Sequence, residues 1–128
     1  MSETANILLV DDEPGMLRYI RTLLEVDEHK VQTACTGEEA VERVQKGFHP
    51  DLVLLDLLMP KRDGLSVLEA LRADDATRGI PVVILSNSSK ELEMHNASAL
   101  GAVDYWIKSN LSLQELCDRV QRLLSGSS

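Results

Sequence analysis

The chain has 128 residues, with 13 lysines and arginines against 21 aspartates and glutamates, so its net charge is −8, and 44% of its residues are hydrophobic. A sequence of this length builds one domain of ordinary size and leaves no room for a second folded module. Nucleic acids and anionic membrane surfaces attract clustered Lys and Arg, whereas the basic residues here are dispersed, so direct nucleic-acid binding is not expected.

The apolar runs of the sequence are short. The run at residues 82–85, for example, is far shorter than the ~20 apolar residues that a membrane helix needs. The N-terminus also lacks a basic segment followed by a long apolar stretch, which a secretory signal would have. We therefore expect a cytoplasmic protein that does not insert into membranes.

The cysteines and histidines show no metal-binding or redox pattern. Cys35 and Cys117 lack CxxC spacing and a neighbouring histidine, so free thiols are expected. The histidines are scattered, and we expect solvated or structural roles for all of them: His29, His49 and His95.

Short apolar runs rich in β-favouring residues alternate with stretches that have helical spacing, which is typical of βα units around a parallel sheet. The predicted strands comprise residues 6–10, 31–34, 52–55, 82–85 and 103–107. The first helix begins near Pro14, and the second ends at Gly47, which can adopt the left-handed conformation after a helix. The fourth helix has the thinnest apolar face, carried by Leu92, Ala99 and Leu100, so looser packing is expected there.

Polar side chains stand at the ends of four predicted strands. Asp11 and Asp12 follow the first strand, Asp56 the third, Ser86 the fourth and Lys108 the fifth. Ligands of open parallel sheets bind at the carboxyl ends of the strands, so these residues are expected to converge. Close carboxylates need a compensating cation, and an all-oxygen set suits Mg²⁺, which takes one or two carboxylates plus a phosphoryl oxygen. A lysine and a hydroxyl beside the acids complete what is needed to stabilise a phosphoryl group during transfer.

Together with Met59-Pro60, Asp63-Gly64 and Tyr105, these residues resemble the receiver domain of two-component response regulators. The resemblance covers about residues 5–124 of a single expected domain, 1–128. It implies a doubly wound α/β fold, in which a five-stranded parallel sheet has the flavodoxin-like order 2-1-3-4-5 and helices cover both faces. It also implies a signalling switch that catalyses only its own phosphorylation and dephosphorylation.

The resemblance assigns a role to each residue of the acidic site. Asp56 would accept a phosphoryl group from the phosphohistidine of a histidine kinase or a phosphotransfer protein, and Lys108 would pair with it. Mg²⁺ would be held by Asp12, by Asp56 and by the backbone carbonyl of Leu58, while Asp11 would act mainly through metal-bound water.

The resemblance further implies a conformational switch. Ser86 would move toward the phosphoryl group and let Tyr105 turn inward, because the modified state alone gives the hydroxyl this partner. The surface formed by the fourth helix, fifth strand and fifth helix would then control a downstream protein target. A homodimer that forms through this face on phosphorylation is a further implication.

The sequence departs from the family pattern at two positions. Ser109 follows the lysine where most receivers have proline joined by a cis bond, and a cis bond before a non-proline residue costs ~3–4 kcal/mol. We predict either a trans Lys108–Ser109 bond with a shifted loop or a strained cis bond. Asn87 follows Ser86 where a smaller residue is usual.

Trp106 is expected on the opposite face of its strand from Tyr105, either as half-exposed packing or as part of a partner surface.

The sequence also bears on three other functions. A phosphatase of the aspartyl-phosphate type generally needs a second acid two residues after its nucleophile, where this chain has Leu58. A mononucleotide binder needs a phosphate-cradling loop rich in Ser, Thr or Gly, whereas residues 11–13 are acidic. A phosphorylation-independent interaction module stays open because of Ser109 and Asn87. Whether the chain acts alone or within a larger regulator is also left open.

Overall fold

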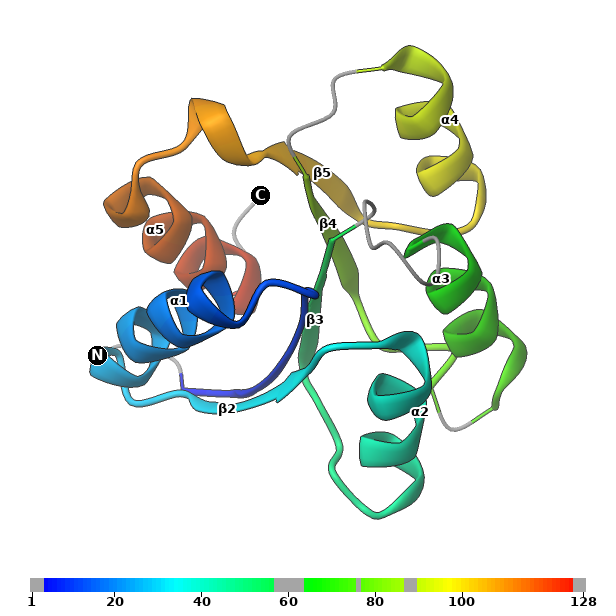
Figure 1. Cartoon of the computed structure of the whole chain (residues 1–128), viewed down its shortest axis with the longest axis horizontal. Coiled ribbons are helices and arrows are strands. Elements are labelled where there is room, and N and C mark those ends of the chain that lie inside the picture. The colour runs from blue at the N-terminus through cyan, green and yellow to red at the C-terminus, as the bar shows by residue number, and fades with distance from the viewer. Residues whose placement is uncertain (1–3, 57–63, 76, 87–89, 126–128) are drawn as a thin grey trace.

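The computed structural model describes residues 4–56, 64–75, 77–86 and 90–125. Five parallel strands form one sheet in the order β2-β1-β3-β4-β5, which confirms the predicted fold class and strand order (Figure 1). The strands are β1 (Asn6–Val10), β2 (Lys30–Ala34), β3 (Leu52–Leu55), β4 (Val82–Ser86) and β5 (Asp104–Ile107). The helices are α1 (Pro14–Val26), α2 (Gly37–Gln45), α3 (Gly64–Ala73), α4 (Glu91–Ala99) and α5 (Leu113–Leu124), with one 3₁₀ turn at Lys108–Asn110. None of the helices described is both long and apolar enough to cross a bilayer.

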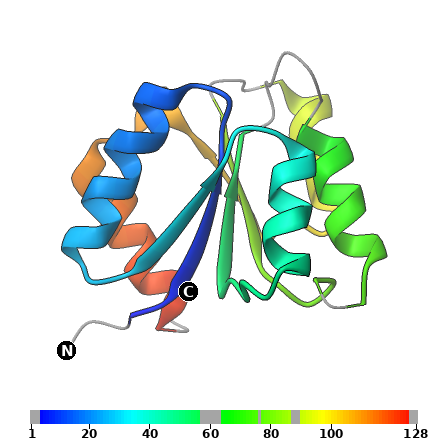
Figure 2. The same ribbon diagram turned by 60° about the horizontal axis from the view of Figure 1, so that its bottom comes forward.

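The sheet separates two apolar layers, because successive residues of a strand point to opposite faces. In β1, Leu8 and Val10 face the layer under α2, α3 and α4, while Ile7 and Leu9 face the layer under α1 and α5. Figure 2 shows these two groups of helices on opposite sides of the sheet. Both faces of the central strands are therefore buried, which explains their continuous apolar sequences.

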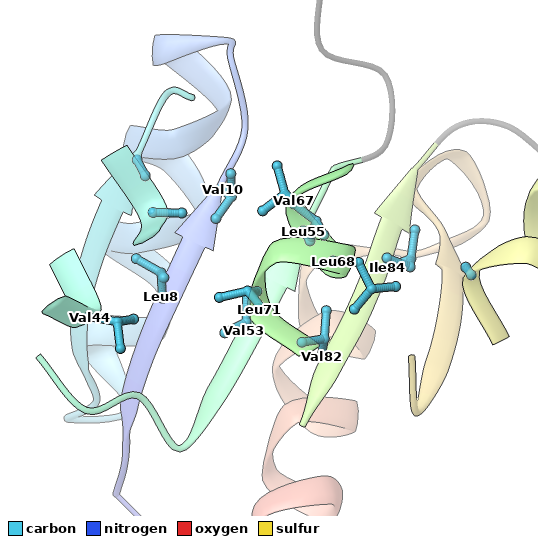
Figure 3. Packing of buried hydrophobic residues seen from close by; sticks show 13 residues of the cluster. Leu8, Val10, Val44, Val53, Leu55, Val67, Leu68, Leu71, Val82 and Ile84 are labelled. Atoms are coloured by element: carbon cyan, nitrogen blue, oxygen red, sulfur yellow. The ribbon is translucent and has the colours of Figure 1, made fainter. Parts of the chain in front are cut away.

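Figure 3 shows the layer under α2, α3 and α4, which we call the first core. Val53 and Leu55 of β3 lie beside Val82 and Ile84 of β4 in this core, and Leu68 of α3 packs over them. The layer under α1 and α5, the second core, is formed by Leu17, Ile20 and Leu24 of α1 and by Leu116 and Val120 of α5, together with strand residues.

Two predicted packing roles are wrong. In α4, Leu92 is 70% exposed and Ala99 is exposed, and the only buried residue among the described side chains of this helix is Ala97. The helix therefore turns a small side chain to the core, which agrees with the expected loose packing. Trp106 is only 3% exposed and belongs to the second core, so it is neither half-exposed nor part of a partner surface.

The helix ends follow local sequence signals. Pro14 lies in the first turn of α1, and Gly47 after α2 has a φ of 107°, as predicted. Thr36 caps α2 by accepting a hydrogen bond from the backbone N–H of Glu39. The start of α5 carries a complete capping box, described below.

Candidate functional site

Three carboxylates meet at the carboxyl end of the sheet. Asp11, Asp12 and Asp56 each offer one oxygen, and these oxygens all lie within 4.8 Å of one another. The pairing of β1 with β3 explains the proximity, because Val10 is opposite Leu55 and the next residues are Asp11 and Asp56. The backbone N–H of Asp56 donates to the carbonyl of Val10 at 2.9 Å, which holds the two chains together at this point.

Asp11 is engaged on both carboxylate oxygens. Oδ1 accepts a hydrogen bond from the backbone N–H of Glu13 at 3.0 Å, and Oδ2 accepts one from Nζ of Lys108 at 2.8 Å. The residue is 3% exposed. A buried carboxylate is stable only when it is paired and hydrogen-bonded, and these two contacts provide both conditions.

Lys108 comes to the acids from the end of β5. Its Nζ lies 3.5 Å from Oδ2 of Asp56, in addition to its contact with Asp11. Burial lowers the pKa of Lys108, but hydrogen bonds and charge attraction to Asp11 and Asp56 outweigh this effect, so the net pKa is raised. The side chain is therefore a fixed ammonium at neutral pH, directly beside the carboxylates.

Ser86 and Tyr105 lie on adjacent strands near this cluster. Ser86 is the last residue of β4, within the strand rather than after it, and is fully buried. Tyr105 is half-buried against the first core and is paired with Ile84 across β4 and β5. Because Ile84 and Ser86 are two residues apart in one strand, Ser86 and Tyr105 share the face covered by α4.

Several residues of the sequence prediction lie outside the described part of the chain. These are Leu58, Met59-Pro60, Asp63 and Asn87; Gly64 is described and begins α3. The backbone carbonyl of Leu58 as a metal ligand, and the crowding by Asn87, stay predictions.

The Lys108–Ser109 bond is trans, since none of the described peptide bonds is cis. Of the two predicted alternatives, the trans bond is the one found. Ser109 lies inside a single 3₁₀ turn, in which the backbone N–H of Leu111 donates to the carbonyl of Lys108 at 3.2 Å.

The structure adds two features that the sequence reasoning missed. One is the backbone N–H of Glu13, which fixes Asp11. The other is the capping box at the start of α5, where Ser112 and Glu115 bond each other's backbone N–H groups. The sequence held a signal for the capping box, because serine followed three residues later by glutamate before apolar residues is its signature.

Comparisons with known proteins agree with this geometry. A family model described as the response regulator receiver domain matches residues 7–121. The chain is 37% identical over 118 residues to the probable transcriptional regulator ycf27 of Porphyridium aerugineum, covering 92% of this chain and 47% of that protein. The chain spans about half the length, or less, of the curated relatives it matches.

Two solved structures illustrate the shared fold. The chemotaxis protein CheY4 of Vibrio cholerae superposes with a TM-score of 0.86 at 25% identity, covering 94% of this chain and 98% of that one. The Mn(2+)-bound form of the response regulator Rcp1 superposes with a TM-score of 0.76 at 30% identity, covering 94% of this chain and 92% of that one.

Proposed function

The chain belongs to the response regulator receiver domain family of two-component signalling, and on this premise we propose that Asp56 is its phosphoacceptor. The donor is the phosphohistidine of a histidine kinase or of a phosphotransfer protein. The observation that carries the proposal is the cluster itself, in which Lys108 contacts Asp11 and Asp56 at 2.8 and 3.5 Å beside three converging carboxylates.

The carboxylates fit a hard divalent cation, and we assign Mg²⁺ to them. An all-oxygen donor set is what Mg²⁺ prefers, and Asp11, Asp12 and Asp56 provide one. Asp12, Asp56 and the backbone carbonyl of Leu58 would hold the ion directly, and Asp11 would act mainly through a bound water. When bound, the ion supplies positive charge against the oxygens of the phosphoryl group. The Mn(2+)-bound form of Rcp1 supports a divalent ion in this family.

The contacts of Asp11 and Asp56 suit these two acids to different roles. Both oxygens of Asp11 already accept hydrogen bonds, which reduces its nucleophilicity, whereas the lysine contact of Asp56 is longer. An oxygen of Asp56 forms the new P–O bond while the P–N bond to the donor histidine breaks, and the electron pair of that bond stays on the imidazole nitrogen. Lys108 then pairs with the phosphoryl oxygens, where its ammonium offsets the transferred charge.

The output follows from the residues beside the cluster. Ser86 moves to the phosphoryl group, and Tyr105, on the same face of the sheet, turns inward. The change appears on the face formed by α4, β5 and α5, which controls a downstream protein and forms a homodimer on phosphorylation. The thin packing of α4, with Ala97 buried and Leu92 exposed, supports a surface that can rearrange at low cost.

We propose a signalling switch rather than a turnover enzyme, acting in the cytoplasm. Its functional unit is a single receiver domain, residues 1–128, with its core at about 5–124. Its product is a changed conformation and not a released compound.

The test is the mass of the intact protein after incubation with acetyl phosphate, with and without Mg²⁺. We expect the wild type to gain one phosphoryl group only with Mg²⁺, and Asp56→Asn to gain none. Asp75→Asn is the matched control, because the Asp75 side chain is 90% exposed and far from the cluster in sequence, so it should be modified like the wild type. No gain from acetyl phosphate or from any candidate kinase would favour the phosphorylation-independent interaction module instead.

A further inference from the structure

Lys108 is carried by a short turn that no proline ring stiffens. The turn, Lys108–Asn110, connects β5 to α5 and contains no proline. A lysine side chain is long and loses much rotational freedom when it is fixed at one point. Something else in this chain must therefore limit where the turn places the ammonium.

Packing alone does not limit it. A cavity of about 170 Å³ lies beside the turn, between α1 and the start of α5. Lys108 and Leu111 both line it, together with Met16 and Ile20 of α1. Side chains that border a surface pocket have fewer protein contacts to hold them than side chains in a close-packed core.

Hydrogen bonds at the start of α5 do hold the turn. The backbone N–H of Leu111 donates to the carbonyl of Lys108 at 3.2 Å, which closes the turn. The next residue, Ser112, accepts a hydrogen bond on Oγ from the backbone N–H of Glu115 at 3.1 Å. Its own backbone N–H donates to Oε1 of Glu115 at 3.2 Å. The end of the turn is thus tied to α5, which Leu116 and Val120 anchor in the second core.

We infer that Ser112 and Glu115 are positioning residues for Lys108, because their hydrogen bonds restrain the turn that carries it. The inference rests on the proposed function, in which Lys108 contacts the phosphoryl group. Without the capping box, the first turn of α5 frays, the turn at Lys108–Asn110 loosens, and the ammonium spends less time on Asp11 and Asp56.

The experiment compares Ser112→Ala with Ser112→Thr, which restores a capping hydroxyl, and with Thr36→Ala. Thr36 is a matched control, because it caps α2 with a hydrogen bond of the same length, 3.1 Å, at the same edge of the sheet. Both alanine variants lose one N-cap, so their melting temperatures should fall by similar amounts. A difference between them at Lys108 then reports position and not stability.

Two readouts are used on each protein. The first is acylation of lysines by an amine-reactive acetyl ester, followed by peptide mass spectrometry, with Lys46 as internal reference since its side chain is 73% exposed. The Lys108 side chain is only 16% exposed in the wild type, so we expect a low labelling rate there. The second is the rate of Mg²⁺-dependent phosphoryl uptake from acetyl phosphate.

We expect Ser112→Ala to label several-fold faster at Lys108 and to take up phosphoryl groups about fivefold more slowly, which corresponds to the ~1 kcal/mol of a lost cap. Ser112→Thr and Thr36→Ala should match the wild type in both readouts. Equal Lys108 labelling in Ser112→Ala and Thr36→Ala would overturn the inference. Labelling does not depend on phosphorylation, so absent phosphoryl uptake in the wild type would count against the proposed function alone.

Discussion

The ammonium of Lys108 lies closer to Asp11, at 2.8 Å, than to the proposed phosphoacceptor Asp56, at 3.5 Å. The lysine thus neutralises mainly Asp11, whose two carboxylate oxygens both accept hydrogen bonds, while its contact with Asp56 is longer. Because a divalent cation would use the same three carboxylates, Lys108 and the metal share one set of negative charges.

Replacing this lysine should strengthen metal binding. In Lys108→Met the carboxylates keep their charge and lose a competing cation, so we expect the dissociation constant for Mg²⁺ to fall by about tenfold, or ~1.4 kcal/mol. Titration calorimetry measures it. Lys46→Met removes an exposed lysine that pairs with Glu42 in α2, and it should leave the constant unchanged. Equal affinities in wild type and Lys108→Met would show that the lysine does not compete.

His29 should make stability depend on pH. It is 3% exposed, and its Nδ1 accepts a hydrogen bond from the backbone N–H of Ala5 at 3.1 Å, which a protonated ring cannot do. Burial lowers the pKa of His29 below its ordinary value of 6.5, although the charge of Asp27 partly opposes this. The unfolded chain then binds the proton more tightly, so the free energy of unfolding falls as the pH drops below 6.5.

Urea denaturation at a series of pH values checks this. We expect His29→Gln to flatten the decline in stability between pH 6.5 and about pH 5. His95→Gln changes an exposed histidine of α4 and is the matched control for the loss of one imidazole. The same slope in wild type and His29→Gln would mean that another group titrates.

Arg72 holds the ends of two helices together. Its guanidinium donates to the carbonyls of Arg78, Ile80 and Gly101 at 2.9, 2.8 and 2.9 Å, and so joins the end of α3 to the turn after α4. Lysine has the charge but not the planar fork. Arg72→Lys should therefore lower the free energy of unfolding by about 1–2 kcal/mol, measured by urea denaturation.

The control for this variant is Arg21→Lys. Arg21 lies on α1 and forms an exposed pair with Glu25 at 3.3 Å, so its replacement should cost under about 0.5 kcal/mol. If both variants unfolded at the same urea concentration, the three carbonyl contacts would add nothing to stability.

Two side chains of α2 bind backbone groups on the outer side of β2. β2 is an edge strand, and Arg43 donates from Nε to the carbonyl of Thr33 at 3.4 Å, while Glu39 accepts from the backbone N–H of Cys35 at 3.1 Å. The backbone N–H of Lys30 points toward β1. Backbone groups of successive strand residues point to opposite sides, so those of residues 33 and 35 point away from β1. Uncovered edges pair with other chains, which such contacts prevent.

The double variant Glu39→Ala/Arg43→Ala should therefore associate at lower protein concentration and lower temperature, as measured by light scattering. Glu42→Ala/Lys46→Ala removes one acid of the same helix and the base at its C-cap, which pair with each other rather than with the strand. Association at the same concentration in both double variants would assign the effect to lost surface charge and not to the strand edge.

The sequence predicted the sheet well, because burial on both faces leaves short continuous apolar runs such as Leu52–Leu55, whose length and flanking turn residues favour a strand over a helix. It also placed the acids and Lys108 at one edge, because parallel strands end together. It placed Trp106 correctly on the opposite face from Tyr105. The extent of burial was wrong for Leu92 and Trp106, because it depends on which neighbours the tertiary structure brings. Trp106 is covered in the second core by residues distant in sequence, which alternation alone does not reveal. Its Nε1 also donates to Asp104 at 2.9 Å, a local contact between residues that share one face of β5.

The Arg72 contacts are a further example of what local patterns cannot supply. They join residues up to 29 positions apart through backbone carbonyls. Every residue has a backbone carbonyl, so the sequence does not indicate which ones Arg72 contacts. The roles predicted for Leu58 and Asn87 stay predictions.

The alternation of β5 makes its single tryptophan a selective optical reporter. Tyr105 faces the first core and Trp106 the second, where Arg119 of α5 lies 5.8 Å from the indole centre. A rotation of the tyrosine ring alone leaves the surroundings of the indole unchanged, whereas a displacement of the strand alters both layers at once. Tryptophan emission therefore separates these two kinds of switching in solution, and it needs no added label.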